Sequence, residues 1–498
     1  MMHGPEKSDL PIVPRKLANK AGYPVAELVE GRGRVDGNAV LQSTVRTQSR
    51  AAVSQAQDRI RGAVNGNGKE KLTALLHHVS VDALRAAFFA LKRRAAPGVD
   101  AMTWDAYEVG REDKLVDLHR RLHAGAYRAL PSRRVYIPKA DGRQRPLGVA
   151  ALEDKIVQAA VVMILTPIYE AEFLGFSYGF RPGRGQHDAL DALAVGIKGR
   201  NVRWILDADI RSFFDRISHD WLIRFLEHRI GDRRIIRLIQ KWLKAGVLEE
   251  GRHVTTEQGT PQGAVISPLL ANVYLHYAYD LWVRAWRTRH ATGDMIVVRY
   301  ADDTIVGFQH RRDADQFLAD LKERLARFSL KLHPDKTRLI AFGRYVADWR
   351  RGHGAGKPET FDFLGFTHIC GTKRNRRGFQ LWRKTKRERK WAAIRRIAEE
   401  LRRIRHDPID EQGHHLARML AGHYAYFSVP TNIAAVRAVH HHAKVRWYLS
   451  LRRRSQRRRL NWRRMNVIVE RHLPKPGILH PWPEQRFYVK HRRQEPDA

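Results

Sequence analysis

Residues 295–308 read MIVVRYADDTIVGF, two apolar runs separated by a pair of aspartates. Residues 296–298 predict one β-strand, and residues 304–308 predict a second strand that returns beside it. The bend between the strands then carries Asp302 and Asp303 at the tip of a hairpin. Aspartate is common in turns for structural reasons alone, because its side chain bonds its own backbone. By itself, therefore, the pair predicts only a turn.

A second acidic segment, ILDADIRSFFD at 205–215, changes this interpretation. It reads as a strand that ends at Asp207 and Asp209, followed by a loop and a helix for which Ser218 is a suitable N-cap. Strand ends from 205–215 and from the hairpin, placed in one sheet, would bring three carboxylates together. Such a cluster repels itself unless cations hold it. Two Mg²⁺ ions would supply that compensation and suit phosphoryl transfer.

Charge and composition point to a nucleic-acid partner. The net charge is +39, and residues 371–498 hold 33 Lys and Arg against 10 Asp and Glu. A polyphosphate partner explains such an excess better than a small acidic substrate does. A single cysteine, Cys370, permits no intrachain disulfide and favours a reducing compartment. The N-terminus lacks a secretory pattern, and no apolar run of about 18 residues predicts a membrane span.

Hydrophobic patterns divide the chain into four regions. Residues 1–70 are rich in Gly, Pro and Arg with little periodicity, which predicts a mostly flexible basic leader. From 71 to 368, helical patterns such as LEDKIVQAAVVMILTPIYEAEF (152–173) alternate with short strands. Residues 369–450 read as helical and strongly basic, and 451–498 as a compact basic extension.

Seven ordered segments resemble the reverse-transcriptase blocks of bacterial group II intron-encoded proteins. They are YIPKADGRQRPLGV (136–149), GFRPGRGQHDAL (179–190), DADIRSFFD (207–215), QGTPQGAVISPLLANVYL (258–275), RYADD (299–303), LHPDKTRL (332–339) and FDFLGF (361–366). Three later segments are similar to the maturase, or thumb, domain of the same proteins: LARMLAGHYAYFSVP (416–430), WYLSLRRRSQ (447–456) and LPKPGILHPWP (473–483). The resemblance covers roughly residues 75 to 480.

The resemblance implies an α+β fold, a right-hand polymerase with fingers and palm on an antiparallel sheet, followed by a helical thumb. It implies an RNA-directed DNA polymerase that binds its own group II intron RNA, assists splicing and copies the intron at a DNA target. Its partners would be intron RNA, the DNA target and primer, and deoxynucleoside triphosphates, with no membrane, in the cytoplasm near the nucleoid. The family's HNH endonuclease needs paired cysteines, so the single Cys370 predicts that this module is absent.

Metal-binding roles follow from matching positions. Asp209 and Asp302 resemble the principal Mg²⁺ ligands of the family, with Asp303 beside them and the carbonyl of Ile210 as an additional oxygen. Asp207 and Asp215 are the alternatives in the first segment. Asp207 lies two residues before Asp209 on the same strand face, but the family pattern selects the aspartate directly before I-x-x-F-F.

Nucleotide-binding roles are implied in the same way. Lys139 and Arg145 match residues that bind the incoming triphosphate. The compact ammonium of a lysine and the planar guanidinium of an arginine both bind phosphate oxygens well. Phe214 resembles the steric gate beneath the incoming sugar, Gln262 a residue near that sugar, and Lys336 a residue near the phosphates. The alternatives are a core aromatic at Phe214 and solvated surface charges at the lysines and the arginine.

Other readings of the whole chain remain open. A splicing-only RNA-binding protein could keep the polymerase fold, and a reverse transcriptase could serve a host process without an intron. The clustered acids favour an active enzyme, because a scaffold need not keep them. The histidines at 440–442 favour a solvated helix over a metal site, since neighbouring helical positions point in different directions. The arginine-rich run 452–459 favours contacts with the phosphates of a folded RNA.

Overall fold

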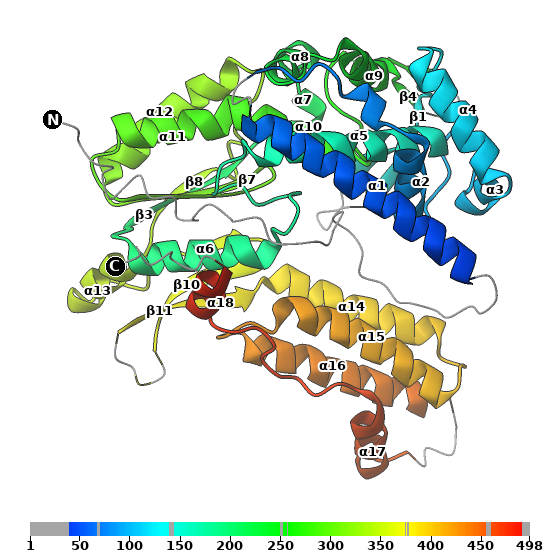
Figure 1. Cartoon of the computed structure of the whole chain (residues 1–498). Helices are drawn as coiled ribbons and strands as arrows, with labels where there is room; N and C mark the ends of the chain where they lie inside the picture. Colours follow the sequence, from blue (N-terminus) through cyan, green and yellow to red (C-terminus); the bar gives the residue numbers. More distant parts are fainter. Residues whose placement is uncertain are drawn as a thin grey trace, which may run out of the picture.

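Helices and short sheets alternate along the chain in the computed structural model (Figure 1). The structure describes residues 39–66, 70–138, 144–249, 252–255, 257–373, 375, 378–454 and 460–490. The predictions made for residues 1–38, Lys139 and the arginines at 457–459 therefore lie outside the described residues. The fold class is α+β, as the sequence predicted.

Four antiparallel strands form the sheet that carries both acidic segments, here called the central sheet. Its spatial order is β6–β7–β3–β8, and the strands are β3 (Trp204–Asp209), β6 (Met295–Tyr300), β7 (Asp303–Phe308) and β8 (Arg338–Ala341). The predicted hairpin is confirmed as β6 and β7, which pair from Met295↔Phe308 to Tyr300↔Asp303. β7 also pairs with β3, so the two acidic segments are neighbours in one sheet.

Alternation along these strands gives the central sheet two buried faces. Leu206, Val297 and Val306 join one hydrophobic cluster, together with residues of α11 (Leu281–Arg289) and α12 (Arg311–Ala326). Ile205 and Ile296 join a second cluster on the opposite face, against α6 (Gln186–Gly199). A one-residue slip would exchange the two sets, so this pattern fixes the register that places the aspartates.

The larger cluster extends through a helical region next to the central sheet. This region contains α2 (Val81–Ala90), α3 (Trp104–Glu108), α4 (Arg111–His123), α5 (Leu152–Glu170), α7 (Phe213–Arg216), α8 (His219–Glu227), α9 (Arg233–Lys244) and α10 (Ser267–Leu275), with a 3₁₀ turn at Leu76–His78. The helices predicted at 152–173 and after Ser218 are confirmed as α5 and α8, and the Ser218 side chain accepts a hydrogen bond from the Trp221 amide. A mixed sheet of order β2–β1–β4–β5 packs beside them; its strands are β1 (Ser132–Pro138), β2 (Gln144–Val149), β4 (Val247–Glu249) and β5 (Arg252–Val254).

Helix α1 (Ala39–Gly66) corrects the prediction of a flexible leader up to residue 70. It lies across the helical region against α2 and α5, the dark blue helix of Figure 1. Val53, Ile60 and Val64 are buried on its inner face, and Gln57 donates a hydrogen bond to the Met163 carbonyl (2.9 Å). The prediction was wrong for residues 39–66 because this apolar stripe is narrow and the rest of the helix is polar.

A second correction concerns the residues after 369, which the sequence predicted to be helical. They continue a three-stranded antiparallel sheet of order β11–β10–β9, formed by β9 (Phe361–Phe363), β10 (Phe366–Thr372) and β11 (Phe379–Thr385). Helix α13 (Arg344–Gly352) precedes this sheet, and α14 (Arg387–Arg403) follows it. The basic residues of β11 resemble the basic helix that follows, but Phe379, Leu381 and Arg383 are buried at alternate positions, as a strand requires.

Four helices then build a bundle around their own core. They are α14, α15 (Ile409–Phe427), α16 (Ile433–Arg452) and α17 (Trp462–His472), of which the first three lie side by side in Figure 1. Trp447 is fully buried at the centre, and its ring N–H donates to the Gln412 side chain (2.9 Å). Met465 and Val469 of α17 complete this core, so the segment after residue 451 continues the bundle.

The last described helix, α18 (Pro483–Lys490), returns to the central region and packs against α6 (Figure 1). Arg486 forms an ion pair with Asp191, whose side chain is 1% exposed. Arg383 of β11 donates to the other oxygen of Asp191 (3.0 Å). One buried carboxylate of α6 thus joins two distant parts of the chain. Among the described residues, no helix is long and apolar enough to cross a membrane.

Candidate active site

The edge of the central sheet gathers the aspartates of both acidic segments. Asp209 ends β3 and Asp303 begins β7, and these two residues are direct partners across the antiparallel ladder. Directly opposed residues of such a ladder have Cβ atoms about 5 Å apart. Asp302 precedes β7 in the hairpin bend. The structure therefore brings Asp209, Asp302 and Asp303 to the same edge, as the two strand ends predicted.

Burial and mutual repulsion raise the pKa values of two of these carboxylates. Burial, followed by the charges of Asp302 and Asp209, raises the pKa of Asp303 to about 7. Burial and the Asp209 charge also raise the pKa of Asp302, whereas Arg145 and Lys336 act in the opposite direction. The Asp303 side chain is exposed at the end of β7, so solvent weakens the effect of burial on its pKa. A bound cation would offset the remaining repulsion from Asp302 and Asp209. This donor set of carboxylate oxygens fits a hard divalent cation.

Lys336 is the cation that the structure places beside the cluster. Its Nζ donates to Asp209 Oδ2 at 2.7 Å. Two backbone hydrogen bonds join the end of β3 to the segment that carries Lys336. The His333 amide donates to the Asp209 carbonyl (2.8 Å), and the Arg211 amide donates to the Lys331 carbonyl (2.8 Å). Within the described ranges, no group of three or more His, Cys, Asp or Glu side chains is arranged closely enough to hold a metal. Metal binding at Asp209 therefore requires its carboxylate to exchange the Lys336 contact for the ion.

Asp207 and Ile210 flank Asp209 in different environments. Asp207 faces Arg338 across β3 and β8, with 3.8 Å between its Oδ2 and the guanidinium. Burial raises the pKa of Asp207 to about 6, and Arg338 opposes that shift. Asp207 lies opposite Ile305 within the ladder, whereas Asp209 lies opposite Asp303 at the end of β3, and this position favours Asp209 as the ligand. Ile210 is buried and forms an antiparallel bridge with Leu332, beside the strand end.

The residues predicted to bind the nucleotide come from different elements. Arg145 lies exposed on β2, close enough for its charge to lower the pKa of Asp302. Gln262 is tied to β2 because its carbonyl accepts from the Gly148 amide (2.7 Å), and its side-chain amide donates to Asp215 (3.4 Å). Phe214 lies in α7, directly after β3. Lys139, the fourth of these predictions, lies outside the described residues.

Two neighbouring phenylalanines of α7 differ in burial. Phe213 is 2% exposed and belongs to the main hydrophobic core, whereas Phe214 is only partly buried and packs on the outside of that core. Their rings meet edge to face at 5.4 Å. The Phe214 carbonyl accepts a hydrogen bond from the Thr260 amide (2.8 Å), which attaches the segment carrying Gln262 to α7. The structure thus separates an aromatic inside the core from one at the margin of that core.

Sequence reasoning missed the residues that support the hairpin bend from inside. Arg299, on β6, is 1% exposed and forms an ion pair with Asp280, which is also buried. The available signal was a lone arginine directly after three apolar strand residues, a position where an unpaired charge is costly. Its partner could not be identified because nothing local in the sequence relates residue 280 to residue 299.

Comparison with known proteins gives a consistent assignment for the central part of the chain. Residues 137–368 match the family model described as reverse transcriptase (RNA-dependent DNA polymerase). Protein YkfC of Escherichia coli strain K12 is 36% identical over 243 residues, which cover 45% of this chain and 63% of that protein. Group II intron-encoded protein LtrA of Lactococcus lactis subsp. cremoris is 43% identical over 166 residues, 33% of this chain and 27% of LtrA. Nuclear intron maturase 1, mitochondrial, of Arabidopsis thaliana is 29% identical over 111 residues, 22% of this chain and 15% of that protein. The chain thus spans less than two thirds of the length of each of these relatives.

Proposed function

We propose that the chain is an RNA-directed DNA polymerase that binds intron RNA, assists its splicing and copies it into DNA, because residues 137–368 match the reverse-transcriptase family model and the chain is similar to a group II intron-encoded protein. The observation that carries this proposal is the register pairing of Asp209 with Asp303, next to Asp302 in the hairpin bend. This pairing puts the three acids of the matched motifs at one edge of one sheet.

The proposed metal ligands are Asp209, Asp302 and Asp303, with the Ile210 carbonyl as a further oxygen. Mg²⁺ held by these oxygens would activate the primer 3′-hydroxyl and neutralise charge on the transferring phosphate and the leaving pyrophosphate. Mutual repulsion in the cluster supports this assignment, since burial and neighbouring carboxylates raise the pKa of Asp303 to about 7. Binding of cations restores the charged form of such a group at neutral pH.

Surrounding side chains would orient the nucleotide. Arg145 and Lys336 bring positive charge to the edge where the triphosphate must lie, and Lys336 becomes free for a phosphate once Asp209 binds metal. Phe214 would lie beneath the sugar, with Gln262 beside it. Lys139 is proposed as a further triphosphate contact because its position matches the family motif. In this arrangement the protein supplies position and charge, which are the main requirements of phosphoryl transfer.

The parts of a right hand can be assigned to the observed elements. We assign the central sheet and the helices on its faces to the palm, and β1, β2 and the neighbouring helices to the fingers. The bundle of α14–α17 would be the thumb and maturase domain. The strong positive charge of residues 371–498 supports contact with the RNA backbone and DNA, and hence a site of action in the cytoplasm at the nucleoid.

A protein that only assists splicing remains the second candidate. The basic bundle would serve that role as well as it would serve polymerisation. The clustered acids favour the enzyme, because like charges at one sheet edge weaken the fold when no cation is present.

Primer extension by the Asp302→Asn protein tests the polymerase assignment. The amide keeps the shape of the side chain but removes the charge at the hairpin tip. We expect folding and RNA binding to persist while extension on a primed RNA template falls at least 100-fold, by about 3 kcal/mol or more of lost transition-state stabilisation. Wild-type extension rates in this variant would exclude Asp302 as a metal ligand. Absence of extension by the wild-type protein, with intact RNA binding and splicing, would favour the second candidate.

A further inference from the structure

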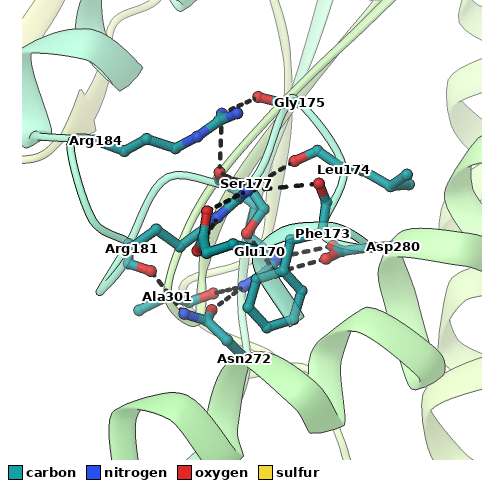
Figure 2. Close-up of polar contacts among 12 residues, drawn as sticks. Glu170, Phe173, Leu174, Gly175, Ser177, Arg181, Arg184, Asn272, Asp280 and Ala301 are labelled. Atoms are coloured by element: carbon teal, nitrogen blue, oxygen red, sulfur yellow. Dashed lines mark hydrogen bonds and ion pairs between the residues drawn. The ribbon is translucent and has the colours of Figure 1, made fainter. Parts of the chain in front are cut away.

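A buried ion pair lies beside the hairpin bend that carries Asp302 (Figure 2). The Arg299 guanidinium meets both oxygens of Asp280: Nε donates to Oδ1 at 2.7 Å and Nη2 to Oδ2 at 2.6 Å. The two side chains are 1% and 0% exposed. Arg299 belongs to β6, three residues before Asp302, whereas Asp280 comes from the helices on one face of the central sheet.

All five N–H groups of this guanidinium have an acceptor. Beyond Asp280, Nη1 donates to the Ala301 carbonyl (2.9 Å) and the Asn272 side chain (3.1 Å), and Nη2 donates to the Ser177 hydroxyl (2.7 Å). Ala301 has φ +55°, a left-handed conformation that is uncommon for a residue with a side chain. Since the Ala301 carbonyl belongs to the peptide that leads into Asp302, Arg299 fixes the plane from which that aspartate departs.

The loop around Ser177 closes the other side of the bend. The Tyr178 amide donates to the Arg299 carbonyl (2.8 Å), and the Arg299 amide donates to the Phe176 carbonyl (2.9 Å), so this loop pairs with β6. Asn272 donates to the Gly179 carbonyl (2.7 Å), and a Cβ at Gly179 would lie 2.3 Å from the Ala301 nitrogen. Only glycine fits at this contact.

A second layer holds the same loop. Arg181 is buried, pairs with Glu170 (2.9 Å) and donates to the Leu174 and Ser177 carbonyls (both 2.8 Å). Figure 2 shows Arg181 beside Glu170 and Ser177. The loop that contacts the bend is therefore itself fixed by a separate ion pair.

The local helix geometry that places Asp280 is unusual. Residues His276–Asp280 form a π-helical turn between α10 and α11. Such turns are rare and occur often at functional sites, because the wider turn redirects side chains. Here the turn ends at the carboxylate that receives Arg299. An ordinary α-helical continuation would rotate this position away from its present direction.

We propose that Arg299, Asp280, Asn272 and Ser177 form a positioning network that holds Asp302 and Asp303 in the geometry that receives the catalytic metal ions. This inference rests on the proposed polymerase function for its kinetic consequences. Stability alone does not explain the network, because apolar side chains of similar volume commonly replace buried ion pairs without loss. Hydrogen bonds in a polar network instead fix the orientation of the groups they join, here the Ala301 carbonyl and the peptide that leads into Asp302. The two aspartates repel each other and Asp209, and the network opposes this repulsion by holding the peptide between Ala301 and Asp302.

Arg299→Lys tests the network while keeping the positive charge. Lysine has three N–H donors where arginine uses five, and it lacks the fork that spans Asp280, Ala301 and Ser177 at once. We expect kcat for nucleotide addition to fall about 100-fold, the scale of a misplaced catalytic group. We also expect the Mg²⁺ concentration for half-maximal rate to rise, with little change in KM for the nucleotide. Ser177→Ala, which keeps the ion pair, should shift both quantities in the same direction by less, and tests the network should Arg299→Lys fail to fold.

Arg383→Lys is the matched control. It alters another buried arginine–aspartate pair, Arg383 with Asp191, which shares no hydrogen bond with the network at the bend. Assays run well below each melting temperature should show normal Mg²⁺ dependence in this variant, even where it is less stable. Equal kinetic losses in both lysine variants, or an unchanged Mg²⁺ requirement in both Arg299→Lys and Ser177→Ala, would overturn the positioning role.

Binding of Mn²⁺ followed by electron paramagnetic resonance separates this inference from the proposed function. Mn²⁺ binding that is abolished in Asp302→Asn and weakened in Arg299→Lys would support positioning even if no primer were extended. In that case the polymerase assignment alone would fail. Mn²⁺ affinity equal to wild type in Arg299→Lys would count against positioning, whatever the wild-type extension rate.

Discussion

Phe214 offers a sharp test of the site, because its neighbour Phe213 supplies a matched control. Phe214→Val shortens the ring that we place beneath the incoming sugar. Phe213→Val makes the same change one position earlier, in a side chain that is 2% exposed within the core. If Phe214 forms the gate, its truncation opens space for a 2′-hydroxyl, whereas truncation of Phe213 opens a cavity in the core.

The expected magnitudes differ in kind. A pocket that senses one small group discriminates by about 1–3 kcal/mol, so Phe214→Val should reduce the preference for deoxyribonucleotides by roughly 5- to 150-fold. Truncating a fully buried phenylalanine to alanine costs about 3–5 kcal/mol of stability. Because valine keeps part of that volume, Phe213→Val should cost less than this but still lower the melting temperature clearly. Phe214 is only partly buried, so its truncation should affect stability less.

Steady-state kcat/KM for paired ribo- and deoxyribonucleotides, measured beside melting curves for both variants, distinguishes these outcomes. A stable Phe214→Val protein with unchanged sugar selectivity would refute the gate. So would an equal change in selectivity in the Phe213 variant, because that ring has no access to the sugar in this arrangement.

Three further predictions concern other parts of the molecule. Burial, then the charge of Arg383, lowers the pKa of His368 to about 3. The unfolded chain therefore binds this proton first, and His368 alone should lower stability by about 2 kcal/mol between pH 7 and pH 5. Urea titrations of His368→Phe should lack this loss, and an identical pH slope in the variant would contradict the assignment. Lys336→Gln removes the cation at 2.7 Å from Asp209. Because this lysine is exposed, we expect the Mg²⁺ concentration for half-maximal rate to fall only about two- to fivefold, while KM for the nucleotide rises. A higher Mg²⁺ concentration for half-maximal rate together with a lower KM would exclude its role. Neutralising the arginines at 452–454 should flatten the dependence of log RNA affinity on log salt by about 0.7–0.9 for each phosphate that the protein no longer neutralises, whereas an unchanged slope in filter-binding titrations would identify a solvated surface.

Local patterns were sufficient to predict the elements that carry the acids. The apolar runs on either side of Asp302 predicted β6 and β7, and the serine before a helical pattern predicted the cap at Ser218. These signals are short in range, because a strand or a cap depends on residues close in the sequence. The placement of the three carboxylates at one end of one sheet was a hypothesis based on chemistry. Neighbouring carboxylates repel one another, and bound cations would offset that repulsion.

The secondary-structure predictions for α1 and β11 were wrong because many charged and polar residues obscured the periodic pattern of the buried apolar residues. The basic residues of β11 made a buried strand resemble the helix after it, and the polar surface of α1 hid the stripe formed by Val53, Ile60 and Val64. The support beneath the bend was missed for another reason. Ser177 and Arg299 are 122 residues apart in sequence, and no local pattern records such a contact.

The connection through Asp191 has a consequence for biosynthesis. Arg486 is made 295 residues after the aspartate that it pairs with. While the chain is being translated, the central sheet and α6 can assemble, but this carboxylate must wait for its second guanidinium. Contacts that close such long loops form late, because the chain loses much conformational freedom when they form. The nascent protein should thus pass through a stage in which the catalytic sheet exists and the basic bundle is not yet fastened to it. A ribosome that stalls before residue 486 would display that stage, with α6 accessible to proteases that the finished molecule resists.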